Sequence, residues 1–263
     1  MFLTRFRFNT ARPGARRVLS SPQVLHAAVM SSFPQLLPTD TPTPDTPRVL
    51  WRLDQQARAE LMLYVVSPER PDMTHLVEQA GWPAAATPEN PGWHTRPYKP
   101  FLDRITAGDH WAFRLTANPV HSIRRKDGEP TKITAHVTPA HQMGWLLDPQ
   151  RQERCGFRIL EKPAGQRLLP DGTTHAGAPH HGDRYTLNVS DTRPLSFNKS
   201  RTADGKRSGK PVTVLTVTFN GHLEVTDPDA LRRCLTQGIG RARAYGCGLL
   251  TLAPIAVASQ AVA

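Results

Sequence analysis

Hydrophobic and polar residues alternate at the start of the chain, and hydrophobic residues then recur at the spacing of a helix. Residues 2–8 alternate apolar with polar side chains, which predicts a half-buried strand that turns Arg5 and Arg7 toward solvent. A basic loop at 12–17 is expected next, and Ser21-Pro22 then predicts the start of a helix. The apolar stripe of this helix comprises Leu25, Ala28, Val29 and Phe33.

Five further segments are expected before residue 106. Residues 38–47 are too polar and too rich in proline to pack, so they predict a loop. Residues 48–54 and 59–66 favour paired strands, 73–81 a short helix, and 93–105 a closing strand or extended segment. The resulting order is strand, helix, strand, strand, helix, strand, which is typical of a ferredoxin-like unit.

The second half of the chain repeats this order. Strands are expected at 110–116, 158–160, 185–189, 212–219 and 249–252, and helices at 138–147 and from 228 onward. Asp148-Pro149 interrupts the first of these helices, and Asp227 caps the second. We therefore expect an α+β protein with two tandem ferredoxin-like (RRM-like, βαββαβ) domains at 1–106 and 109–263.

A glycine-rich stretch at 238–248 separates the last expected helix from the last expected strand. Glycine tolerates positive φ and close approach of a ligand, and two arginines in the stretch favour a phosphate as that ligand. The dinucleotide fingerprint lacks its third glycine at position 243, and the P-loop ending is absent. A helix C-cap at Gly238 followed by an ordinary turn explains the glycines equally well.

The net charge of the chain indicates which classes of partner it binds. Lysine and arginine number 33 against 22 aspartate and glutamate, a net charge of +11, which favours nucleic acid or an anionic membrane surface. No apolar stretch approaches the ~20 residues of a membrane span, so a soluble, cytoplasmic protein is expected. Two basic runs stand out, one at 124–126 and one at 199–210, although a solvated hairpin tip accounts for such a run about as well.

Cysteine and histidine do not form a metal-ligand pattern. Cys155, Cys234 and Cys247 are far apart in the sequence without a C-x-x-C pair, so they are expected to be reduced core residues. The three histidines of the stretch at 175–181, His175, His180 and His181, resemble a metal cluster, but a solvated loop explains them better. We expect no metal and no cofactor.

The glycine-rich stretch carries a family resemblance. Its Gly-Ile-Gly, five residues, Gly-Cys-Gly pattern resembles the C-terminal motif of the RAMP superfamily. The run 214–252, with Thr-Val-Thr-Phe-Asn-Gly-His-Leu-Glu-Val-Thr-Asp-Pro before the helix, is similar to the CasE family, the CRISPR RNA-processing endoribonucleases of subtype I-E Cascade. This resemblance implies the tandem ferredoxin-like fold independently of the element order.

The resemblance also implies site residues. Members of the family place a catalytic histidine on the first helix, where this chain has His26, whereas the tyrosine of some members is replaced here by Gln23. Lys199 and Arg201 are the candidates for stabilising charge on the phosphate. The expected RNA-binding residues are Gln23, Arg124, Arg125, Lys126, Lys206, Arg207, Lys210, Gly238, Gly240, Arg241, Arg243, Gly246 and Gly248.

RNA supplies its own nucleophile, the 2′-hydroxyl, so such a cut needs proton transfer and charge stabilisation but no metal-bound water. The resemblance implies cleavage at the 3′ side of a CRISPR repeat stem-loop, with 2′,3′-cyclic phosphate and 5′-hydroxyl ends. It also implies that the mature crRNA stays bound and that other Cascade subunits are partners. The alternative is an RRM-like or RAMP subunit that binds RNA without cutting it.

Overall fold

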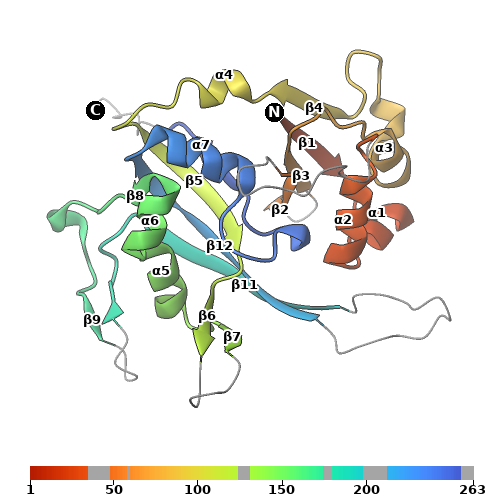
Figure 1. Ribbon diagram of the computed structural model, residues 1–263. Coiled ribbons are helices and arrows are strands. Elements are labelled where there is room, and N and C mark those ends of the chain that lie inside the picture. Colours follow the sequence, from red (N-terminus) through yellow and green to blue (C-terminus); the bar gives the residue numbers. More distant parts are fainter. Residues whose placement is uncertain (35–47, 58–59, 124–130, 174–178, 198–211, 256–263) are drawn as a thin grey trace, which may run out of the picture.

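The protein has an α+β fold with two antiparallel sheets (Figure 1). The computed structural model describes residues 1–34, 48–57, 60–123, 131–173, 179–197 and 212–255. No helix in these ranges is long and apolar enough to cross a membrane.

The first sheet has the order β2-β3-β1-β4, and all of its strand pairs are antiparallel. Its strands are β1 (Phe2–Phe8), β2 (Leu50–Ala57), β3 (Glu60–Ser67) and β4 (Trp93–Pro97). The alternation predicted for β1 is confirmed, since Thr4, Phe6 and Phe8 are buried while Arg5 and Arg7 are exposed. This pattern requires that one face of the sheet be covered by helices.

The second sheet has the order β11-β12-β5-β13, and β8 pairs with the far end of β12. Its strands are β5 (His110–Ala117), β8 (Phe157–Ile159), β11 (Leu187–Phe197), β12 (Val212–Val225) and β13 (Leu250–Ala253). Two small hairpins lie outside it, β6 (Val120–Ile123) with β7 (Lys132–Ala135) and β9 (Gly172–Thr173) with β10 (Pro179–His180). Both β11 and β12 extend beyond the strands expected at 185–189 and 212–219.

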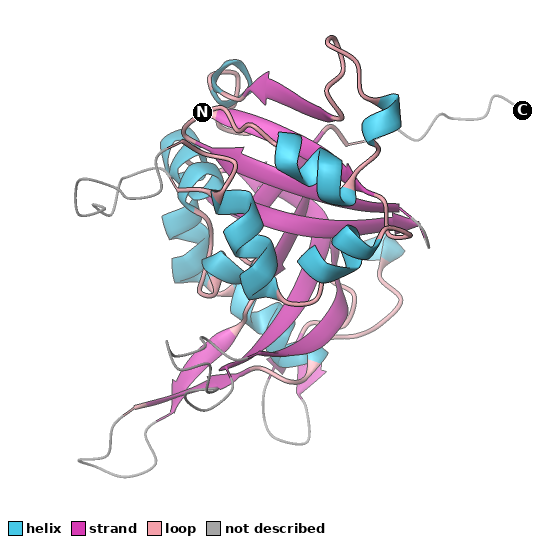
Figure 2. Ribbon diagram, turned by 90° about the vertical axis from the view of Figure 1, so that its right-hand side faces the viewer, coloured by secondary structure: helices cyan, strands magenta, loops and turns pink. Residues whose placement is uncertain are grey.

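Helices pack against the strands of both sheets (Figure 2). They are α1 (Pro13–Val18), α2 (Pro22–Met30), α3 (Thr74–Ala80), α4 (Lys99–Leu102), α5 (Pro139–Leu147), α6 (Pro149–Cys155) and α7 (Pro228–Gln237), with short 3₁₀ turns η1 (Pro83–Ala85), η2 (Ala164–Gln166) and η3 (Arg243–Tyr245). Side-chain caps begin four of them, from Ser21, Thr138, Asp148 and Asp227. A proline follows each cap, where its missing N–H costs no hydrogen bond.

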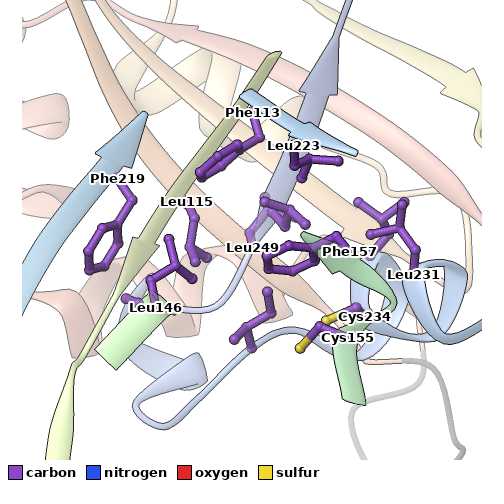
Figure 3. Close-up of a cluster of buried hydrophobic side chains, with 14 of the residues drawn as sticks. Phe113, Leu115, Leu146, Cys155, Phe157, Phe219, Leu223, Leu231, Cys234 and Leu249 are labelled. Carbon is purple, nitrogen blue, oxygen red and sulfur yellow. The ribbon is translucent and has the colours of Figure 1, made fainter. Parts of the chain in front are cut away.

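Two clusters of buried side chains form the core. The first joins β1 and β3 to α1, α2 and α3 through residues such as Phe6, Leu25 and Leu63. The second fills the space between the second sheet and its helices (Figure 3) and includes Phe113, Leu115, Leu146, Phe157, Phe219, Leu223, Leu231 and Leu249. It also takes Leu50, Val66 and residues of the 98–105 segment from the first half of the chain. The two halves therefore share a packed interface.

Several expectations needed correction. The basic loop at 12–17 contains helix α1, because Ala15 and Val18 bury their side chains in the first core. The segment 93–105 is strand β4 followed by helix α4, not one extended stretch. Helix α6 and the β6–β7 hairpin were not predicted. Cys155 and Cys234, far apart in sequence, meet where α6 and α7 pack together, and both are free thiols (Figure 3).

Candidate active site

A cleft of about 390 Å³ lies between the two halves of the chain. One side is formed by the α1–α2 turn, helix α2 and strand β2, and the other by β5, β11, β12 and the glycine loop, residues 238–248. Its lining includes Ser21, Pro22, Leu25, Trp51, Leu53, Gln55, Arg114, Thr116, Asp191, Arg193, Thr216, Thr218, Tyr245 and Gly246. A ligand in this cleft would contact both halves at once.

His26 lies beside the cleft, on the turn of α2 next to Leu25. The indole N–H of Trp51 donates a hydrogen bond to His26 Nδ1 over 3.4 Å, so the proton of the neutral ring is on Nε2. Burial lowers the pKa of His26 below its ordinary value, because the half-buried ring is poorly solvated when charged. His26 is therefore neutral at neutral pH and able to exchange a proton at its ring nitrogens.

Trp51 is held by the glycine loop. A Cβ on Gly246 would lie 2.6 Å from Trp51 Cζ3, so only glycine allows the backbone to approach the indole this closely. Gly246 also has a φ of +82°, which other residues rarely adopt. The 3₁₀ turn η3 within the loop packs against both α2 and β2, as the blue loop beside the red helix in Figure 1 shows.

A buried ionic cluster fixes β2 against the second sheet. Arg52, 2% exposed, forms two hydrogen bonds with the Asp54 carboxylate, at 2.7 and 2.8 Å. Its remaining donors reach the carbonyl oxygens of Arg114 and Leu249 and the Thr251 hydroxyl, at 2.8 to 2.9 Å. Every donor nitrogen of the guanidinium is thus bonded, as a buried charge requires. The cluster sets the position of the neighbouring Trp51.

The four glycines of the loop differ in their surroundings. Gly238 caps α7 at φ +80° and faces the Leu50 side chain, and Gly248 at φ +91° faces the backbone of Ile239. These two and Gly246 are buried, and protein packing alone accounts for glycine at all three positions. Gly240 is partly exposed. RNA contact at the four glycines stays a prediction.

The two arginines of the loop point to a second hollow. Arg241 is exposed, whereas Arg243 is half-buried with its Nε inaccessible to solvent and unpartnered in the described structure. Both line a hollow of about 360 Å³ beside α5 and α6. None of its lining residues also lines the cleft, so Arg241 and Arg243 do not converge with His26.

Other predicted site residues lie outside the described residues: Lys199, Arg201, Lys206, Arg207, Lys210, Arg124, Arg125 and Lys126. The first five fall between the end of β11 at Phe197 and the start of β12 at Val212, and the last three follow β6. Gln23 is partly exposed on the first turn of α2, three residues before His26. His175 also lies outside the described ranges, within which no group of three histidine, cysteine or acidic side chains is placed to hold a metal ion.

Three features of the cleft were not predicted from the sequence. Trp51 contacts His26 across 25 residues of sequence, a separation that no local pattern encodes. Tyr245 lines the cleft from the glycine loop, with its ring packed edge-on against Phe197 at 4.6 Å between centroids. Arg114 and Arg193 face each other across Asp191, with ion pairs of 4.0 and 3.4 Å. The aromatic residue between two glycine pairs was the one available signal.

Comparison with known proteins places this architecture. The sequence profile of the family described as "CRISPR associated protein" matches residues 1–254. The chain is 30% identical over 255 residues to CRISPR-associated endoribonuclease Cse3 of Thermus thermophilus, which covers 97% of this chain and 100% of that protein. The chain belongs to the Cse3/CasE family of CRISPR-associated endoribonucleases. The predicted family resemblance is thereby confirmed.

Further members of the Cse3/CasE family support this placement. The Escherichia coli Cascade subunit CasE is 42% identical over 150 residues, 54% of this chain and 57% of that protein. The structure of Cse3 bound to a 19 nt RNA superposes with a TM-score of 0.65 at 28% identity, covering 97% of this chain and 100% of that one. A structure of Thermus thermophilus Cse3 with an RNA representing a pre-cleavage complex gives a TM-score of 0.66 at 26% identity and covers 96% and 98% of the two chains.

Proposed function

We propose that this protein is an endoribonuclease that cuts CRISPR precursor RNA at the 3′ side of the repeat stem-loop. The observation that supports this most is its full-length homology to the endoribonuclease Cse3, together with a neutral histidine beside the interdomain cleft. The relatives named above include a Cse3 bound to RNA and a Cascade subunit. In this proposal the protein keeps its mature crRNA bound and joins other Cascade subunits.

The proposed reaction is attack of the 2′-hydroxyl on the adjacent phosphorus, which leaves a 2′,3′-cyclic phosphate and a 5′-hydroxyl. His26 moves a proton in this step: its lowered pKa keeps the ring neutral, and the ring accepts a proton at Nδ1 when the long hydrogen bond from Trp51 opens. While that hydrogen bond is closed it fixes the tautomer, so that Nε2–H is the donor available to an RNA oxygen. No metal-bound water is needed, because the nucleophile belongs to the substrate.

A second proton-transfer group is required at the other oxygen. Gln23 can orient a hydroxyl or phosphate oxygen but has no titratable proton. Tyr245 is the one tyrosine among the residues that line the cleft, and we assign its hydroxyl to this role. Arg114 and Arg193 are already paired with aspartates, so charge on the phosphate is assigned to Lys199 and Arg201.

We also interpret the two halves as tandem ferredoxin-like domains, 1–106 and 109–263. The first sheet has the order β4-β1-β3-β2, which is that of a ferredoxin-like unit. In the second sheet, β13-β5-β12-β8 follows the same order, and β11 extends the edge that β8 begins. The active site then lies where the domains meet, which is a common position for ligand sites.

The test is cleavage of a repeat hairpin RNA by the purified protein in the presence of chelator. A single 2′-deoxy nucleotide before the scissile phosphate should abolish cleavage and leave binding nearly intact. His26→Ala should lower the single-turnover rate by at least ~10²-fold with little loss of affinity, because a proton carrier acts mainly in the transition state. His94→Ala, which changes an exposed histidine of β4, is the matched control and should cut normally.

Each result has a defined meaning. Cleavage of the deoxy substrate at the same bond, or activity that disappears with chelator and returns with magnesium, would refute the metal-independent mechanism. A fully active His26→Ala variant would place the proton carrier elsewhere. Tight binding of the hairpin without any cleavage would favour the alternative, a non-catalytic RNA-binding subunit.

A further inference from the structure

Four arginines gather in the hollow on the α5–α6 side of the glycine loop. We call this hollow the arginine pocket; it has a volume of about 360 Å³. Arg151 and Arg154 come from α6, and Arg241 and Arg243 from the glycine loop. The rest of the lining is Asn118, Val120, Trp145, Cys155, Gly238, Ile239 and Gly240, which includes no carboxylate.

The positive charge of the arginine pocket is not neutralised within the described structure. None of its four arginines forms an ion pair with a described carboxylate, whereas Arg114 and Arg193 in the cleft both do. The charge of Asp148 raises the pKa of Arg151, but the Asp148 carboxylate caps α6 by accepting a hydrogen bond from the Arg151 backbone N–H at 2.8 Å. Like charges held together without a counter-charge favour binding of an anion.

Two of the four guanidinium groups, those of Arg151 and Arg154, are held in place by other contacts. Arg151 lies over the Trp145 ring at 4.1 Å and donates to the Trp145 carbonyl oxygen. Arg154 Nε donates to the Gln150 carbonyl at 3.2 Å. Arg243 Nε is buried without a partner, although the rest of its side chain is half-exposed. An arginine that is preorganised by other contacts loses less entropy when it binds a phosphate.

Cys155 shows that three of these charges converge. A hydrogen bond with Cys234 lowers the pKa of the Cys155 thiol, and the charges of Arg151, Arg154 and Arg243 lower it further, against the opposing effect of burial. Burial and the nearby Arg48 charge likewise lower the pKa of Arg243. Three positive charges that act on one thiol lie close together, which makes the potential of the pocket positive.

We propose that the arginine pocket binds one backbone phosphate of the RNA, other than the scissile phosphate. The two phosphates differ because the glycine loop lies between the pocket and the cleft, which share no lining residue. Val120, the first residue of the β6–β7 hairpin, also lines the pocket. An RNA strand bound along this hairpin would therefore pass the arginine pocket. The choice of RNA over a free anion as the ligand rests on the proposed function. The surplus of positive charge in the pocket is observed independently of that function.

The test is binding of a repeat hairpin with a 2′-deoxy nucleotide at the cleavage position, measured over a range of salt concentrations. The test variant is Arg154→Gln with Arg241→Gln; both residues are exposed, so the fold should tolerate the changes. The matched control is Arg70→Gln with Arg104→Gln, which removes the same charge from exposed positions that do not line the pocket. The test variant should bind roughly tenfold more weakly and flatten the slope of log K against log salt by at least roughly 0.7, the effect of one lost phosphate contact.

Neutral methylphosphonates, placed one at a time in the RNA, identify the phosphate. At one position outside the scissile bond, the methylphosphonate should weaken binding by wild-type protein. At that same position it should not weaken binding by the test variant any further. On natural RNA, the loss in the test variant should appear in KM rather than in kcat, because a contact made equally in the ground and transition states contributes to binding only.

Equal affinity and equal salt slope for the test and control variants would overturn the proposal. If, in addition, inorganic phosphate stabilised wild type but not the test variant against heat, the pocket would be a free-anion site instead. If wild-type protein bound RNA through the pocket but cut nothing, the proposed function would fail while the pocket assignment stood.

Discussion

Replacement of Gly246 by alanine tests whether the glycine loop positions the candidate active site. A Cβ at this residue would lie 2.6, 2.9 and 3.1 Å from three atoms of the Trp51 ring, where ordinary contact begins at 3.4 Å. The ring or the loop must therefore shift, and we expect the hydrogen bond from the ring to His26 Nδ1, already 3.4 Å long, to lengthen or break. The positive φ adds about 1 to 2 kcal/mol and the overpacking about 1 to 3 kcal/mol to the cost.

Gly108→Ala is the matched control, because Gly108 has a φ of +84° and a Cβ there would meet nothing within 4 Å. It should lose about 1 to 2 kcal/mol of unfolding free energy in denaturant titration, and Gly246→Ala about 1 to 3 kcal/mol more. Gly246→Ala should also cut saturating RNA roughly 10- to 10²-fold more slowly, because displacement of a catalytic group is costly. Equal stability loss in the two variants, with wild-type cutting by both, would refute the coupling between loop, Trp51 and His26.

Three further changes test neighbouring parts of the site. Trp51→Phe removes the N–H that favours the neutral ring, so the pKa of His26 should rise. The acid limb of the profile of kcat/KM against pH should then move to higher pH, and the rate of cutting should fall roughly fivefold. An acid limb that does not move would contradict the role assigned to Trp51. Tyr245→Phe keeps the ring packing but removes the hydroxyl, so cleavage should fall by at least ~10²-fold at unchanged affinity; an active variant would exclude the phenol as the second proton carrier. Arg52→Met should lower the unfolding free energy by about 3 to 5 kcal/mol by leaving Asp54 poorly paired, whereas the exposed control Lys99→Met should change it by less than about 0.5 kcal/mol; similar losses for both would show that the buried pair is not stabilising.

Local patterns were sufficient for the elements whose signals lie within a few residues. Strand β1 followed from alternation, and α7 from a capping aspartate, a proline and a C-terminal glycine. Helix α1 was missed because its six residues include a proline, a glycine and two arginines and show no helical apolar period, and its stability comes from packing against α3. Gly14 permits that packing, since a Cβ there would lie 2.1 Å from the Gln79 carbonyl oxygen. No pattern within 13–18 contains this contact.

The site was predictable only where family resemblance replaced local pattern. His26 was chosen by resemblance, and the structure adds its Trp51 partner and its place beside the cleft. The arginines of the glycine loop were predicted to bind RNA because they lie between the glycines of the motif. In three dimensions, Arg241 and Arg243 line the arginine pocket, whereas Tyr245 lines the cleft. Arg243 and Tyr245 are close in sequence and yet line separate hollows. Proximity in sequence is thus a poor guide within a turn.

The alternation of β2 connects the two halves of the candidate enzyme. Leu50, Arg52 and Asp54 face the second sheet, where the Arg52 cluster bonds to β5 and to the residues in and before β13. Trp51 faces the opposite way, toward His26 and the first core. One rigid strand therefore transmits the position of the second sheet directly to the histidine. In the proposed function, an active site fixed from both sides in this way would keep its contacts with the RNA after the cut, as retention of the mature crRNA requires.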